Sequence, residues 1–372
     1  CLSGAILLMM CLSISSLSGC KGKGGADDPV TPEAVPEGFA AANEALVKQR
    51  EKDLKEIVAV KVGDADVSMQ TAMFLIYSME VQGNGYAAYY ESQSGVDYWE
   101  MEYDELGRTT REVFKEETID ALIQYAVLYD CAVKDGMFLT EEEMAEMNAF
   151  VANIIGTLSA EETERAGFTK VNLRETCAWM MLGEKYYKKM TENLGITKKD
   201  IERSIKIKDF KEYETEYVYL PTTYYDEEYN ICEESEDIVK ERKDRMQTYY
   251  EQVTEGATFE DLAFGDEELV HKTRTFLEKG DEAEERYKSV AMELEVGEVS
   301  APVQTEYGVY LIRMIDDECT KTYDATVQAE YEIKKNEAFQ IAYEILLETY
   351  DVSVNEAAWE DIVLGATVSI LE

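Results

Sequence analysis

The chain has 372 residues, of which 45% are hydrophobic, and its 78 acidic and 36 basic residues give a formal net charge of −42. Its length allows two or three domains, and its charge opposes binding to the phosphates of nucleic acids. It has one histidine, His271, and no GxGxxG, P-loop, HExxH or GxSxG motif. Histidine-based triads, histidine-rich zinc sites and the usual nucleotide-binding signatures are therefore excluded, and we expect no metal and no cofactor.

The first segment has the pattern of an export signal. Residues 1–19 carry no charge, contain the apolar run Ala5–Leu12 and end in small residues before Cys20. The run is too short to span a membrane, and the glycines and lysines that follow disfavour the alternative, a buried core helix. The pattern resembles the bacterial lipobox. The resemblance implies a lipoprotein signal peptide at 1–19 and lipidation of Cys20, so that the mature chain would be extracytoplasmic and lipid-anchored to the bacterial cell membrane.

The basic residues and initiator methionine that normally precede such a signal are absent, so we expect the sequence to be truncated at its start. Residues 20–45 are rich in Gly, Asp and Pro and lack an apolar period, which predicts a flexible tether. We expect ordered structure to begin near Ile57.

The next elements are mostly helical. A strand at 57–62, a turn and a helix starting after Ser68 are followed by residues 82–108, a Gly- and Tyr-rich stretch without a period that we interpret as an inserted loop or irregular helix. Further helices are predicted at 110–134, after Thr140, after Ser159, at 171–194 and at 198–208. The pieces VAVKVGDADVS, IDALIQYAVLYDCAVKDGMFLTEEEM and LGITKKDIERS resemble, in this order, the N-terminal region of the SurA and PrsA extracytoplasmic chaperones.

The region 212–317 predicts a small mixed module. Its expected elements are a strand at 217–221, a helix at 236–254, a short helix at 258–263, a helix around Tyr287 and a final strand at 309–314. Before that strand come a turn at Gly297, an extended Pro302–Val303 segment and a second turn in which Gly308 is free to adopt positive φ. The order of helix, LxxGExSxPV, turn and YGxxxIxxxxD resembles the end of the parvulin family of peptidyl-prolyl isomerases.

The combined resemblance implies an α+β fold. A mostly helical chaperone domain would be formed by 46–211 with 322–372, because a long helix at about 323–349 and a strand at 352–354 return after the module. The parvulin-like module, 212–317, would be inserted in it. Four cysteines remain in the body of the chain without metal-like spacing (Cys131, Cys177, Cys232 and Cys319), and the sequence assigns no disulfide among them.

Isomerisation of an X-Pro bond needs an apolar slot for the proline and polar groups matched to the twisted amide. The resemblance places the two family histidines at Tyr217 and Tyr310, and the acidic or thiol position at Asp266. It places the proline pocket at Phe276 and Tyr287. The methionine that lines this pocket in the family falls near Ala283. The tyrosines are either polar members of the core or weak catalytic groups, and His271 is expected in a loop.

The resemblance therefore implies a membrane-anchored, extracytoplasmic foldase or chaperone that assists the folding of exported proteins. Its partners would be unfolded or partly folded exported proteins. Whether it is an enzyme stays open, since both family histidines are missing. The alternatives are a catalytically inactive holdase that keeps only the parvulin fold, and a surface lipoprotein that binds another ligand.

Overall fold

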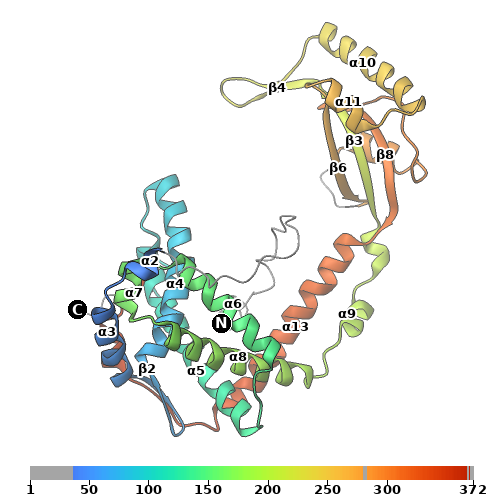
Figure 1. Cartoon of the computed structure of the whole chain (residues 1–372). Helices are drawn as coiled ribbons and strands as arrows, with labels where there is room; N and C mark the ends of the chain where they lie inside the picture. The colour runs from blue at the N-terminus through green and yellow to red at the C-terminus, as the bar shows by residue number, and fades with distance from the viewer. Residues whose placement is uncertain (1–36, 280–282, 367, 369–372) are drawn as a thin grey trace, which may run out of the picture. The chain divides into compact units, whose positions relative to one another are not determined.

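The computed structural model describes residues 37–279, 283–366 and 368 (Figure 1). Contacts divide the chain into two compact units: the first runs to Gly195 and resumes at Lys335, and the second is Ile196–Lys334. The predicted signal peptide 1–19, the lipidation site Cys20 and most of the tether 20–45 lie outside the described residues. Within the described ranges, no helix is both long enough and apolar enough to cross a lipid bilayer.

The first unit is mostly helical. Its helices are α2 (Glu37–Ala41), α3 (Glu44–Glu56), α4 (Met69–Ser94), α5 (Thr110–Lys134), α6 (Glu141–Thr157), α7 (Ala160–Ala166), α8 (Lys170–Glu192), the part of α13 (Lys321–Leu347) from Lys335 onward, α14 (Glu356–Glu360) and the 3₁₀ helix η2 (Tyr98–Glu100). The capping boxes expected at Thr140 and Ser159 are present, each hydroxyl accepting from the N–H three residues on. They satisfy backbone donors that a helix start leaves open.

Ordered structure begins earlier than we expected. Helix α3 precedes Ile57, and its side chains Val47 and Leu54 are buried. Asn43 caps this helix by accepting a hydrogen bond from the Ala45 N–H at 3.1 Å. The expectation of order only from Ile57 is therefore wrong, because two buried positions seven residues apart are enough to attach a helix that is otherwise polar.

The C-terminal part of the chain completes the first unit. Strand β9 (Val352–Val354) pairs antiparallel with β1 (Val58–Val62), which also pairs with β2 (Ala65–Ser68). Trp359, 1% exposed, donates from its indole nitrogen to the Ala59 carbonyl at 3.1 Å. The mostly helical, discontinuous fold class that we predicted is confirmed. The compact units change over at 195/196 and 334/335, and the limits 46–211, 212–317 and 322–372 stay predictions.

The Tyr- and Gly-rich stretch is more regular than we expected. Helix α4 continues to Ser94, so residues 82–94 are helical rather than an inserted loop. Trp99 packs against Gly83 and Gly365 so closely that a Cβ at either glycine would lie under 3 Å from the indole. Its indole nitrogen also donates to the Asn84 side chain at 2.9 Å.

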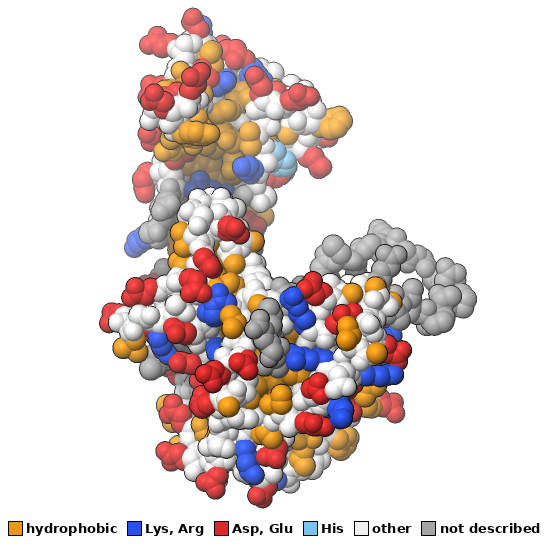
Figure 2. Space-filling view, turned by 90° about the vertical axis from the view of Figure 1, so that its left-hand side faces the viewer, with side chains coloured by type: hydrophobic (Ala, Val, Ile, Leu, Met, Phe, Trp, Pro, Cys, Tyr) orange, Lys and Arg blue, Asp and Glu red, His pale blue; other side chains and the backbone are white. Residues whose placement is uncertain are grey.

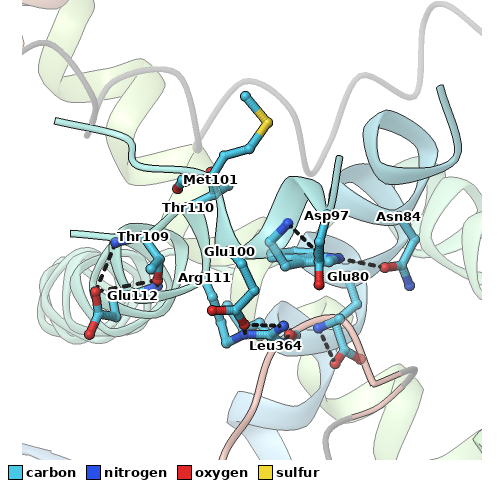
Figure 3. Close-up of polar contacts among 12 residues, drawn as sticks. Glu80, Asn84, Asp97, Glu100, Met101, Thr109, Thr110, Arg111, Glu112 and Leu364 are labelled. Atoms are coloured by element: carbon cyan, nitrogen blue, oxygen red, sulfur yellow. Dashed lines mark hydrogen bonds and ion pairs between the residues drawn. The ribbon is translucent and has the colours of Figure 1, made fainter. Parts of the chain in front are cut away.

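Hydrogen bonds also join the residues around α4 and the start of α5 to residues 364–368 (Figure 3). The buried Glu80 carboxylate accepts from the backbone N–H groups of Gly365, at 3.1 Å, and Val368. Arg111 donates to the Leu364 carbonyl and pairs with Glu100 at 2.9 Å. The contacts of Glu80 and Arg111 with residues 364–368 join positions more than 250 residues apart, which explains why local periodicity did not reveal the helix.

The second unit contains a four-stranded antiparallel sheet in the order β6–β3–β8–β7. Its elements are α9 (Lys198–Ser204), η3 (Ile207–Phe210), β3 (Glu212–Pro221), the hairpin β4 (Thr223–Tyr225) and β5 (Ile231–Glu233), α10 (Glu236–Thr254), α11 (Phe259–Gly265), β6 (Val270–Leu277), α12 (Glu285–Ala291), β7 (Val303–Gln304), β8 (Gly308–Cys319) and the start of α13.

Gly308 does not have the positive φ that we expected. A Cβ there would lie 2.7 Å from the Leu220 carbonyl oxygen, so glycine permits close pairing of β3 and β8.

Candidate functional site

The central sheet of the second unit has two distinct faces, because successive side chains of a strand point to opposite sides. On one face, Val218 and Leu220 of β3 form a core with Met246 of α10 and Phe259 of α11. The opposite face carries aromatic side chains packed with α12. In Figure 1, α10 and α11 lie beside the β3–β8 pair. The predicted proline-binding site falls on the aromatic face.

Six aromatic residues form what we call the aromatic cluster: Tyr213, Tyr217, Tyr219, Phe276, Tyr287 and Tyr310. Three of them form a triangle of ring centroids: Tyr217 lies 5.5 Å from Tyr310 and 5.7 Å from Tyr287, and Tyr287 lies 5.4 Å from Tyr310. Phe276 and Tyr287 are each 1% exposed, and Tyr310 is 8% exposed. Five of the six predicted site residues thus come together, because Ala283 packs in the same core as the four aromatic ones. The aromatic rings fill one another's space.

The hydroxyl groups in the cluster differ in what they contact. Tyr287 lies 2.8 Å from the Thr215 hydroxyl, which in turn donates to the Arg274 carbonyl, so the Tyr287 hydroxyl is the donor of that bond. Within the described residues, the hydroxyls of Tyr217 and Tyr310 have no hydrogen-bond partner. Two phenol groups are therefore free to bind an amide carbonyl or N–H of a peptide.

Burial raises the pKa of all three tyrosines of the triangle. For Tyr310, the neighbouring charge of Glu284 raises the pKa further. The phenols therefore stay protonated at neutral pH and offer hydrogen-bond donors rather than bases. An amide twisting about its C–N bond needs such donors but no proton transfer, so this set can bind a peptide group without acting on it covalently.

Asp266, the predicted acidic member, has partners outside the aromatic cluster. It follows α11, accepts from the Tyr249 hydroxyl at 2.5 Å and pairs with Arg245 of α10. Burial alone would raise the pKa of Asp266, but the bonds from Tyr249 and Arg245 outweigh burial and lower it. These contacts give Asp266 a structural role in joining α10 to the end of α11.

His271 is not a loop residue, as we expected, but lies in β6. Its Nε2 is 2.6 Å from the Glu216 carboxylate of β3, which also pairs with Arg313 of β8 at 2.5 Å. The Arg313 guanidinium lies over the Phe259 ring at 4.8 Å. These three side chains join three neighbouring strands on the face opposite the aromatic cluster. The loop expectation failed because the connection after α11 is short and β6 begins at Val270.

The sequence analysis missed Tyr213, Tyr219 and Thr215 as members of the site. Tyr219 stacks on Tyr310 with centroids 4.8 Å apart and planes 10° apart. The alternation Tyr213, Thr215, Tyr217, Tyr219 was a usable signal, because alternate residues of one strand share a face. Applying that period to the whole of β3 would have placed all four beside the predicted site.

A family model described as "Rotamase: PPIC-type PPIASE domain" matches residues 228–316. The chain therefore carries a domain of the peptidyl-prolyl isomerase class to which parvulins belong, as the sequence predicted. The match covers less than half of the chain. A search of curated proteins finds no match.

Solved structures similar to this chain are of the PrsA and SurA-like type that the sequence resembles. PrsA from Bacillus subtilis is 17% identical, with 83% of this chain and 98% of that chain covered and a TM-score of 0.23. Foldase protein PrsA from Lactococcus lactis is 11% identical, with 84% and 99% covered and a TM-score of 0.30. A structure of the SurA-like chaperones PEB4 and Cj1289 from Campylobacter jejuni is 12% identical, with 80% and 99% covered and a TM-score of 0.29. The identification of the domain rests on the family model alone.

Proposed function

We propose that the protein is an extracytoplasmic foldase or chaperone that assists the folding of exported proteins and is anchored to the bacterial membrane through lipidated Cys20. The observation that carries the proposal is the parvulin-type domain at residues 228–316. The lipobox-like segment that ends at Cys20 supports the extracytoplasmic location and the membrane anchor. The excess of acidic side chains, spread over the surface in Figure 2, supports solubility while apolar surface is exposed to clients.

The aromatic cluster favours holding a client over isomerising it. A catalyst of X-Pro isomerisation must lower a barrier of about 18–20 kcal/mol by binding the twisted amide better than the planar one. Here the rings of Tyr217, Tyr287 and Tyr310 pack against one another at centroid distances of 5.4–5.7 Å. A proline ring that enters between these rings must displace them, and that displacement costs part of the binding energy that catalysis needs.

A weak isomerase activity is the second candidate. The free hydroxyls of Tyr217 and Tyr310 favour it, because each can donate a hydrogen bond to the amide as it twists. The two candidates differ in one respect: catalysis depends on these hydroxyls, whereas holding depends on apolar contact area.

An aggregation assay of the full chain tests the proposal. An unfolded client of near-neutral charge is diluted from denaturant, and light scattering is followed with and without an equimolar amount of the chain, with serum albumin as the inert control. We expect the chain to delay and reduce scattering, and albumin to leave it unchanged. Scattering that is equally unaffected by both proteins would refute a chaperone function.

A further inference from the structure

A second candidate site lies in the first unit, outside the parvulin-type domain. A cavity of about 720 Å³ opens between α5 and the C-terminal half of α13, within the roughly 300–1,000 Å³ of ordinary ligand pockets. Ala121, Ile123, Tyr343, Leu347 and Val352 give it an apolar floor. Nothing in the proposed isomerase-like site uses this cavity.

The rim of the cavity is acidic. Asp120, Glu344 and Glu348 line it and are exposed, and within the described residues none of the three has an ion-pair partner. None of the residues that line the cavity is a lysine or arginine. The nearby Lys134 lies over the Tyr350 ring but already pairs with Asp130 at 2.6 Å. Although residue Asp120 is exposed, its carboxyl group is partly shielded by its neighbours, and this partial burial and the charge of Glu116 raise its pKa, as expected where carboxylates lack a cation.

Gln124 is a separate indication that the cavity has an occupant. It lines the cavity, is 5% exposed, and its side-chain amide nitrogen has no hydrogen-bond partner among the described residues. A buried polar group without a partner costs free energy that a ligand can recover. The amide nitrogen is a donor with less than 1 Å² of accessible surface, so it can meet an acceptor such as a carbonyl oxygen only when the Gln124 side chain turns into the cavity.

We propose that this cavity binds a lysine or arginine side chain of an unfolded client polypeptide. The aliphatic stem packs on the apolar floor and the cation lies among Asp120, Glu344 and Glu348. The client's backbone carbonyl accepts from Gln124 once that side chain has turned its amide into the cavity. Metal ions and simple polyamines supply a cation but no carbonyl, and among residues 37–279, 283–366 and 368 no three side chains converge as metal ligands. The inference rests on the proposed function and names the client class: basic segments with apolar neighbours, which the net charge of −42 also attracts.

Fluorescence anisotropy with the purified full chain tests this inference. The probes are fluorescein-labelled peptides GLKGLKGLKG, GLSGLSGLSG and GLEGLEGLEG, which differ only in the charged position. We expect the lysine peptide to bind about tenfold or more tightly than the serine peptide, and the glutamate peptide not to bind. Equal affinity for the lysine and serine peptides overturns the inference. So does complete displacement of the lysine peptide by equimolar spermidine or Ca²⁺, since the occupant would then be a small cation.

Matched variants separate the cavity from the overall charge. Glu344→Gln with Glu348→Gln should weaken binding of the lysine peptide about five- to tenfold, because each exposed ion pair contributes up to about fivefold. Glu142→Gln with Glu146→Gln removes the same charge, at the same spacing, from exposed positions of α6 and should change affinity less than about twofold. An equal loss in both double variants overturns the inference.

Gln124→Met tests the buried amide. Since the amide nitrogen has no partner, the variant should keep the melting temperature of the free chain or raise it, and should weaken peptide binding. A lower melting temperature with unchanged binding assigns Gln124 a structural role and overturns its part in the site. If the chain suppresses client aggregation but shows no preference for the lysine peptide, only this inference fails. If it suppresses no aggregation, the proposed function fails.

Discussion

Replacing Trp359 with alanine should destabilise the first unit and leave the second unchanged. Trp359 is 1% exposed, and its indole ties α14 to the Ala59 carbonyl of β1, 300 residues earlier. Truncation of a buried tryptophan to alanine costs about 3–5 kcal/mol. The Ala59 carbonyl also accepts from the Asn355 N–H at 3.1 Å, so it keeps a donor and adds no further penalty. With a urea dependence of about 2–3 kcal/mol per molar, the midpoint should fall by about 1–2.5 M.

Tryptophan fluorescence measures this change selectively. The three tryptophans of the chain, Trp99, Trp179 and Trp359, all belong to the first unit. Trp359→Phe should cost less, about 1–2 kcal/mol, since most apolar contact remains and one hydrogen bond is lost. Phe276→Ala, in the second unit, is the matched control and should leave the fluorescence midpoint unchanged. An unchanged midpoint in Trp359→Ala would refute the conclusion that the C-terminal segment is part of the first unit.

Three further predictions follow from the sequence and the fold. Replacing 212–317 with a short Gly/Ser linker should leave a helical protein that unfolds cooperatively by circular dichroism; a 46–211 fragment that is native-like and unaffected by the C-terminal piece would contradict this. In a suitable bacterial host, Cys20→Ala should accumulate unprocessed precursor and abolish lipid labelling, and normal labelling would reject the anchor. Burial alone would raise the pKa of Glu212, but hydrogen bonds from Thr322 and the Cys319 thiol lower it from 4.5. The stability that Glu212 contributes is thus present above pH 4.5 and lost as the pH falls through the lower folded value. Glu212→Gln should remove that loss in acid titrations followed by circular dichroism, and an unchanged titration would contradict it.

Elements with local signals were predictable from the sequence. Helix α5 begins at a Thr109 cap and ends before Gly136, whose φ is +68°, so both ends are encoded by neighbouring residues. Strand β9 and the last strand of the module also lie where their β-branched and aromatic runs predicted. At these places local preference and tertiary structure agree.

The remaining features depend on contacts between distant residues. Helix α4 passes through Gly83 and Gly85, which weaken helical preference, and it is stabilised by Trp99 and by Glu80, which binds the end of the chain. Within the site, the family resemblance pointed to Tyr217, Tyr287 and Tyr310, and the structure brings their rings together. It could not reveal that Asp266 pairs with Arg245 and accepts a hydrogen bond from Tyr249. A contact between two separate elements does not change the residue pattern of either element.

We propose that the parvulin-type domain, which has an aromatic cluster at the positions where the resemblance places the two family histidines, holds clients without isomerising them efficiently. The most direct test measures cis–trans isomerisation of a proline tetrapeptide by the full chain, beside an active parvulin and beside the aggregation assay. Each tenfold in rate corresponds to about 1.4 kcal/mol of selective binding of the twisted amide. We expect weak or no acceleration together with suppression of aggregation. Acceleration equal to that of the active parvulin, lost in Tyr217→Phe or Tyr310→Phe, would contradict the claim and make those hydroxyls catalytic.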